Sequence, residues 1–215
     1  MARKPTFNGA ALPQNNSAAL PPDAAFFDRI RQGDVGAVKN VLATRKAAAN
    51  WQQTSSGQRG LHLAAMTNQR KIAAELVKAG AEIEARDHLG RTPLLQAARS
   101  GQPNMIEFLL LNRADIKAQD KEGNTVLHLA AESISADTIV ALIEAGADSS
   151  ARNKNGGTAI DVALAHGNRA MAELIRSQAQ KHPAAPAAAL PPLHETVREI
   201  EPLKPLNPRK RTQDR

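Results

Sequence analysis

The side chains that could do chemistry recur at a fixed interval along this 215-residue sequence. Asp87 and Asp120 are separated by one interval of about 33 residues, and His62 and His128 are separated by two such intervals. A metal site or a catalytic acid–base pair needs such groups to converge on one place. Midway between the two histidines the sequence has Leu95, which leaves the series without a set of ligands. We therefore predict no metal site, and we expect the aspartates to cap turns.

Other signatures of catalysis are missing from the sequence. It has no glycine-rich phosphate loop, no HExxH motif and no serine in a nucleophile-elbow context. It has no cysteine, which excludes disulfides, thiolate metal sites and cysteine nucleophiles. We expect that this protein is not an enzyme and that it has no catalytic residue, no cofactor and no small-molecule substrate.

The same interval extends to the residues that shape turns and helices. It separates successive members of three series: Gly57, Gly90, Gly123 and Gly156; Thr92, Thr125 and Thr158; and the pairs Ala64-Ala65, Ala97-Ala98 and Ala130-Ala131. A glycine suits a tight turn, a threonine can cap the helix that follows, and paired alanines let helices approach closely. The sequence therefore predicts one helical unit that is repeated along the chain.

This unit resembles the ankyrin repeat, which has the same period of about 33 residues. The resemblance implies an all-α solenoid of about five helix-turn-helix repeats with short β-turn fingers. It also implies that His62 and His128 bridge backbone groups of neighbouring repeats. The predicted repeat domain covers 24–177, divided as 24–53, 54–86, 87–119, 120–152 and 153–177.

The two ends of the chain differ in composition from the repeats. Residues 1–23 are rich in Pro, Ala and Asn, and we expect them to form a disordered arm. Residues 178–215 read as a disordered Pro/Ala-rich linker and a basic tail that contains Arg209, Lys210 and Arg211. We expect neither a signal peptide nor a membrane-spanning helix.

Some residues depart from the repeated pattern. Arg113 stands where the other repeats have a glycine that ends the second helix, and Ile134 stands at the position of the glycine between the helices. We expect Arg113 to cost about 1–2 kcal/mol if it keeps a left-handed conformation, and we expect the turn at Ile134 to be rearranged. The only tryptophan, Trp51, lies in an unusually long link, where it either anchors a partner or fixes the link to the solenoid.

The resemblance implies that partners contact the fingers and the exposed side of the first helices, the concave face. The candidate protein-binding residues are Trp51, Arg86, His88, Leu89, Arg91, Arg99, Ser100, Lys121, Glu122, Asn124, Glu132, Ser133, Arg152 and Lys154. Basic residues outnumber acidic ones in this set, so it is either a solvated face or a weakly basic groove for a protein with an acidic surface. Reversing the charges of Arg91 and Arg99 is expected to weaken binding and to leave stability nearly unchanged.

The sequence favours a protein-protein interaction module. The alternative is an adaptor or a secreted effector whose basic C-terminal tail carries the main interaction or a targeting signal. Nucleic acid is a less expected partner, because no aromatic residues lie among the basic residues of the tail for base stacking. The absence of cysteine fits the cytoplasm, with the nucleus or secretion without a classical signal peptide as alternatives.

Overall fold

The structure is a computed structural model, and it describes residues 24–132 and 135–181. The predicted arm over residues 1–23, the predicted rearrangement at Ile134 and the basic tail all lie outside the described residues.

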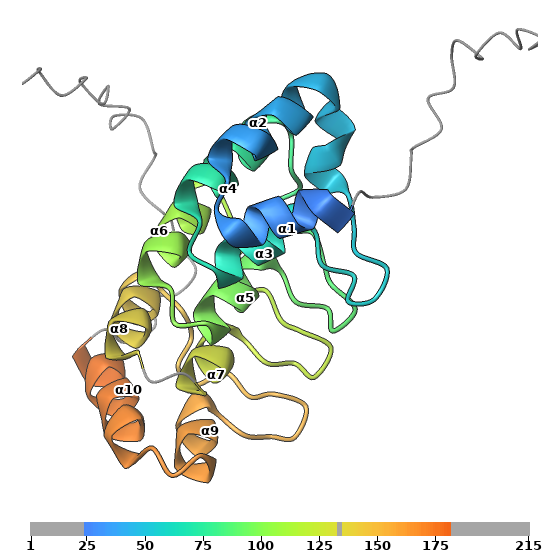
Figure 1. The fold of residues 1–215 in the computed structure, drawn as a ribbon. Coiled ribbons are helices and arrows are strands. Elements are labelled where there is room, and N and C mark those ends of the chain that lie inside the picture. Colours follow the sequence, from blue (N-terminus) through green and yellow to red (C-terminus); the bar gives the residue numbers. More distant parts are fainter. Residues whose placement is uncertain (1–23, 133–134, 182–215) are drawn as a thin grey trace, which may run out of the picture. The chain divides into compact units, whose positions relative to one another are not determined.

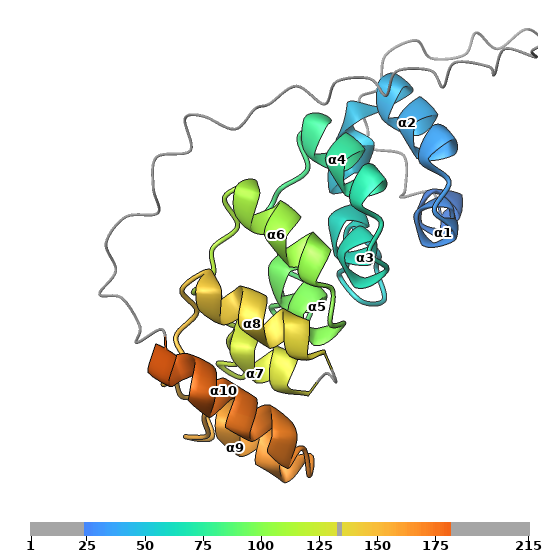
Figure 2. The ribbon, with the colours of Figure 1, turned by 90° about the vertical axis from the view of Figure 1, so that its left-hand side faces the viewer.

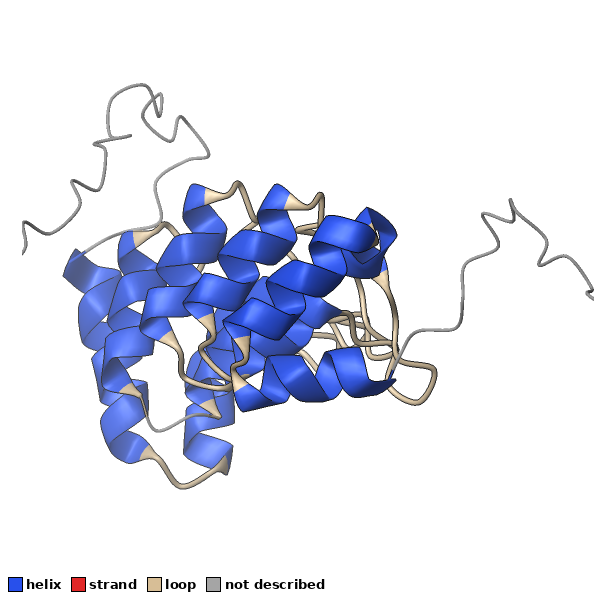
Figure 3. Cartoon of the chain, turned by 45° about the horizontal axis from the view of Figure 1, so that its top comes forward, coloured by secondary structure: helices blue, strands red, loops and turns tan. Residues whose placement is uncertain are grey.

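The described residues form pairs of antiparallel helices joined by loops, and no strand occurs among them (Figures 1 and 3). The only β-type pairing recorded for them is an isolated bridge between Gln52 and Arg59. The helices are α1 Ala24–Gln32, α2 Val35–Thr44, the 3-10 helix η1 Lys46–Asn50, α3 Gly60–Met66, α4 Arg70–Lys78, α5 Pro93–Arg99, α6 Pro103–Leu111, α7 Val126–Ala131, α8 Ala136–Glu144, α9 Ala159–Ala165 and α10 Arg169–Lys181. The predicted all-α solenoid is confirmed.

The helices form two layers. The first helices of the repeats, from α1 to α9, contact one another in succession, and the second helices, from α2 to α10, lie against them in a second row (Figure 2). Local sequence starts the helices of the first layer: the Thr92 hydroxyl accepts a hydrogen bond from Leu95 N at 3.4 Å, and Pro93 occupies the first turn. We call the first helices of the repeats (α1, α3, α5, α7 and α9) the inner helices, and the second helices (α2, α4, α6, α8 and α10) the outer helices.

The core lies between the layers and between successive repeats. Leu61, Leu94 and Leu127 occupy equivalent positions of three inner helices and are at most 1% exposed. The paired alanines are equally buried, as at Ala97 and Ala98, and their small side chains allow the inner helices to pack closely. Each repeat therefore buries its apolar residues against its neighbours.

Arg113 adopts the left-handed conformation that its position predicted, with φ of 67°. One further residue other than glycine has positive φ among the described residues. This is Asn68, with φ of 57°, at the position that Gly101 occupies one repeat later. Asparagine tolerates this conformation better than most residues, which accounts for its presence there.

Trp51 is part of the hydrophobic core at the link between the first and second repeats. Its side chain is 9% exposed, and its ring meets the Phe26 ring edge-on with the centroids 5.5 Å apart. The long link is also held by Asn50, which donates to Gly80 O and accepts from Glu82 N, both at 2.9 Å. Trp51 therefore fixes the link to the solenoid, and its indole is not available as an interface anchor.

The last repeat ends later than expected. Helix α10 continues to Lys181, beyond the predicted boundary at 177.

Helix α9, the partner of α10, begins with a reciprocal cap, in which the backbone N–H and the hydroxyl of Thr158 both donate to the Asp161 carboxylate at 2.8 Å. These hydrogen bonds, that of the backbone first, lower the pKa of the Asp161 carboxyl.

Candidate protein-binding surface

Four loops precede the inner helices from α3 to α9, and we call them the fingers: residues 53–58, 87–91, 120–124 and 153–157. They extend from the inner helices toward the right of Figure 1. Each junction between neighbouring fingers has one backbone hydrogen bond of 3.0 Å: His88 N to Ser56 O, Lys121 N to Leu89 O, and Lys154 N to Glu122 O. The fingers therefore form one continuous row.

A side-chain acceptor at the first position closes each of the last three fingers. Asp87 Oδ1 accepts from Leu89 N at 2.9 Å and from Arg91 N at 2.8 Å. Asp120 has the same role in the next finger. The structure confirms that these aspartates cap turns. Asn153 does the same in the last finger; we did not single it out, although its position one repeat after Asp120 indicates the role.

Two of the candidate arginines hold the fingers from the side. Arg86 Nη1 donates to Gly90 O of its own finger at 2.9 Å and to Gln119 O of the next repeat at 2.7 Å. Arg152 Nη1 donates to Gly156 O at 2.6 Å. Both residues are exposed, so they stabilise the fingers and also add positive charge to the surface.

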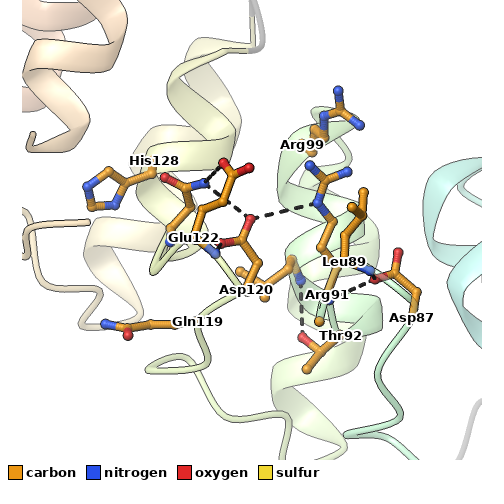
Figure 4. A network of polar contacts seen from close by, with 12 residues as sticks. Asp87, Leu89, Arg91, Thr92, Arg99, Gln119, Asp120, Glu122 and His128 are labelled. Carbon is orange, nitrogen blue, oxygen red and sulfur yellow. Dashed lines mark hydrogen bonds and ion pairs between the residues drawn. The ribbon is translucent and has the colours of Figure 1, made fainter. Parts of the chain in front are cut away.

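A polar network between the second and third fingers contains two further candidates, Arg91 and Asn124. Figure 4 shows Arg91 beside Asp120 in this network. The Arg91 side chain is 14% exposed, and its Nε lies 3.8 Å from Asp120 Oδ2. Asn124 is 8% exposed; its amide donates to Asp120 Oδ2 at 3.2 Å and accepts from Asn153 at 2.9 Å. These side chains join the fingers to one another and offer little surface to a partner.

The position of Arg91 corrects the expectation for the double charge reversal. A glutamate at this position would stand beside the buried carboxylate of Asp120, and like charges at short range destabilise a fold. The expectation of nearly unchanged stability therefore does not hold. A substitution that tests binding must lie further out on the fingers.

The remaining candidates form the exposed part of the surface. Leu89 is 53% exposed at the tip of its finger, and His88, Lys121, Glu122 and Lys154 are exposed beside it or on the later fingers. On the inner helices, Arg99 Nε donates to Glu132 Oε2 at 3.3 Å. Ser100 is half-buried at the end of α5, and Ser133 lies outside the described residues. We call Leu89 and its four exposed finger neighbours the finger surface.

His62 and His128 bridge neighbouring repeats, as the resemblance implied. His62 Nδ1 accepts from Arg59 N at 3.1 Å, and its Nε2 contacts Arg91 O at 2.9 Å. His128 makes the same pair of contacts with Thr125 N and Gly157 O. Because both ring nitrogens of each histidine are engaged, neither is free to bind a metal. No cluster of three or more potential ligands occurs in the part of the chain that the structure describes.

The burial of His62 predicts a dependence of stability on pH. Desolvation lowers the pKa of His62 below its ordinary value of 6.5, because the charged form cannot be hydrated in the core. The unfolded chain therefore binds the proton first, so the free energy of unfolding is highest above about pH 6.5 and falls as the pH drops through and below that value. We expect the midpoint of thermal unfolding to decrease accordingly between about pH 7.5 and pH 5.

Two variants identify the source of this slope. His62→Gln removes the titrating group and is expected to flatten the dependence on pH. His88→Gln changes an exposed ring and is expected to keep it. An equal slope in the His62 variant would show that other groups carry the dependence.

No helix in the described ranges has the length and the apolar character that are needed to span a membrane.

Comparison with known proteins agrees with this geometry. The family model for "Ankyrin repeats (3 copies)" matches residues 26–120 and 96–184. The chain is 37% identical over 91 residues to the human protein phosphatase 1 regulatory subunit 27, a match that covers 42% of this chain and 58% of the relative. It is 46% identical over 67 residues to the rat NF-kappa-B inhibitor alpha, covering 31% of this chain and 20% of the relative.

These matches span only part of the relatives, at most 58% of their length. The names of both relatives describe proteins that regulate or inhibit another protein, which supports a protein-interaction module in this chain. The family model covers well over half of the sequence, and its repeats coincide with the helix pairs and fingers of the structure. The chain belongs to the ankyrin-repeat family.

Proposed function

We propose that this protein is a non-catalytic interaction module whose partner protein docks on the finger surface. The observation that carries the proposal is the exposure of Leu89, a large apolar side chain that is 53% exposed at the tip of a hydrogen-bonded finger. A single exposed leucine is ordinary on a protein surface. Leu89 lies on the second of the four fingers, and the next two fingers carry exposed side chains of both charges, which a partner protein can contact.

The rigidity of the fingers favours binding. The finger surface is held in place before a partner binds by the backbone hydrogen bonds between fingers, by the aspartates that cap the turns, and by the hydrogen bonds of the Arg86 side chain. Less conformational entropy is then lost on association, so more of the contact energy appears as affinity.

The charges of the fingers favour a partner with an acidic surface. The fingers and the residues directly before them carry four exposed basic residues, Arg86, Lys121, Arg152 and Lys154, and one exposed acidic residue, Glu122. Arg99 and Glu132 neutralise each other, and Asp87 and Asp120 are buried within the fingers. Complementary charge raises the rate of association and discriminates among partners more than it adds affinity.

A comparison of two chains separates this proposal from binding through the basic tail. We expect a chain that ends at Lys181 to capture the same proteins from a cell extract as the full-length chain, because the finger surface is complete in both. Captured proteins would be identified by mass spectrometry, with circular dichroism as the control for folding. Capture by the full-length chain alone would assign the interaction to residues 182–215 and contradict the proposal.

A further inference from the structure

The outer helices α4, α6 and α8 each present a stripe of side chains on the side opposite their buried residues. A stripe consists of residues spaced i, i+4 and i+7, which share one face of a helix. The stripes are Lys71, Glu75 and Lys78 on α4; Asn104, Phe108 and Leu111 on α6; and Asp137, Ala141 and Glu144 on α8. The outer two residues of each stripe are exposed, and the middle one is half-buried. The three helices lie side by side in this order (Figure 2), and we call their stripes the outer face.

The charge of the outer face changes sign across α6. The stripe of α4 has two lysines and that of α8 has two acidic residues, whereas the stripe of α6 is uncharged. Residues one repeat apart form two rows across the face: Lys71, Asn104 and Asp137, and Lys78, Leu111 and Glu144. Each row therefore runs from a basic residue through a neutral one to an acidic one.

The charges at the two ends of the first row are available to a second molecule. Neither Lys71 nor Asp137 has an ion-pair partner among the described residues. Lys78, in the other row, is partly neutralised by its own helix, because its Nζ lies 3.2 Å from Glu75 Oε1. Lys71 and Asp137 are therefore the charges that an intermolecular contact can best satisfy.

We propose that the outer face binds a second copy of the chain about a two-fold axis parallel to α6. Such an axis keeps the direction of the helices and reverses their order, so α6 lies over α6 of the partner and α4 lies over α8. Lys71 then faces Asp137 of the partner subunit, and Leu111 faces Leu111 of the partner subunit. The charge pair forms twice, because both subunits use the same patch.

The sign reversal favours a second copy over an unrelated protein. A patch that is basic on one side of an uncharged helix and acidic on the other is complementary to itself after this rotation, whereas an unrelated partner requires neither feature. The centre is apolar, as in most interfaces: Leu111 is 52% exposed, and Phe108 is half-buried with the Arg70 guanidinium 5.9 Å from its ring centroid. Glu107, the one charge of α6, lies to the side of the stripe.

The expected association is reversible and sensitive to salt. Exposed charge pairs contribute little each, and salt screens them. The fingers extend from the inner helices on the opposite side from α4, α6 and α8 (Figure 1), so each copy keeps its finger surface open. Self-association through the outer face is thus independent of the partner proposed for the fingers.

Sedimentation equilibrium of the full-length chain at low ionic strength tests the inference. We expect the unmodified chain to form dimers that dissociate as salt is added. Lys71→Glu places like charges together at two points of the dimer, and we expect the association constant to fall at least about tenfold. Lys71→Glu with Asp137→Lys exchanges the two charges and recreates the pairs, so we expect association to return to within about threefold of that of the unmodified chain.

Arg29→Glu is the matched control. It changes the net charge as much as Lys71→Glu does, at an exposed residue of the inner helix α1, and is expected to leave association unchanged. Circular dichroism verifies that each variant is folded. An unmodified chain that stays monomeric at low ionic strength would overturn the proposal. An equal loss of association in the single and the exchanged variant, or in the Arg29 variant, would overturn it as well.

Discussion

Replacing Gly57 with alanine is expected to lower the free energy of unfolding by about 2–5 kcal/mol, the sum of a conformational cost and a steric one. A left-handed residue with a side chain costs about 1–2 kcal/mol, and Gly57 has φ of 72°. The new methyl group would also overlap His88 Cδ2 and lie 2.7 Å from His88 N, where the second finger crosses the first. Such overpacking adds about 1–3 kcal/mol. Urea unfolding followed by circular dichroism measures the change.

Gly156→Ala is the matched control for this prediction. Gly156 has nearly the same φ, 78°, but a methyl group there meets nothing within 4 Å. The control therefore has only the conformational cost, about 1–2 kcal/mol. The difference between the two variants measures the contact between the first and second fingers. Equal losses would mean that the row of fingers is looser than its hydrogen bonds indicate.

The fixed interval between equivalent residues made most of the fold predictable. Each repeat uses the same local devices, so the cap at Thr92 or the turn at Gly90 can be assigned once and transferred along the chain. Arg113 shows how far this extends: it keeps the left-handed conformation that Gly80 and Gly146 have at the same position, although a residue with a side chain disfavours it. The bridging role of His62 and His128 was implied by the resemblance to the ankyrin repeat, and the structure shows the contacts.

The binding surface was less predictable, because burial depends on what lies across a junction. Arg91 and Asn124 occupy finger positions that the pattern marks as exposed, yet the next finger covers them through Asp120 and Asn153. Trp51 illustrates the same limit, since only the packing of α1 shows that its indole meets Phe26. A periodic sequence identifies which residues share a row but not how deep each side chain lies.

The largest effect on function is expected from Leu89→Ser combined with Lys121→Glu. This change removes the exposed apolar tip and reverses an exposed basic charge on the next finger, whose backbone N–H bonds to Leu89 O, and both side chains lie outside the core. If Leu89 is a hot spot of the interface, its loss alone costs about 2 kcal/mol of binding free energy or more, which is a decrease in affinity of about 30-fold. Thermal stability is expected to remain close to that of the unmodified chain.

The chain offers a control of the same chemistry on its outer side. Leu111 is 52% exposed at the end of helix α6, and the exposed Lys117 lies in the loop that follows. Leu111→Ser with Lys117→Glu therefore removes an equally exposed leucine and reverses one lysine away from the fingers.

The dissociation constant of a captured partner, measured by isothermal titration calorimetry for these two variants and the unmodified full-length chain, tests the finger surface most directly. We predict that the Leu89/Lys121 variant binds at least about 30-fold more weakly and that the Leu111/Lys117 variant binds as the unmodified chain does. Unchanged binding by the Leu89/Lys121 variant, or an equal loss in both variants, would contradict the proposed role of the fingers.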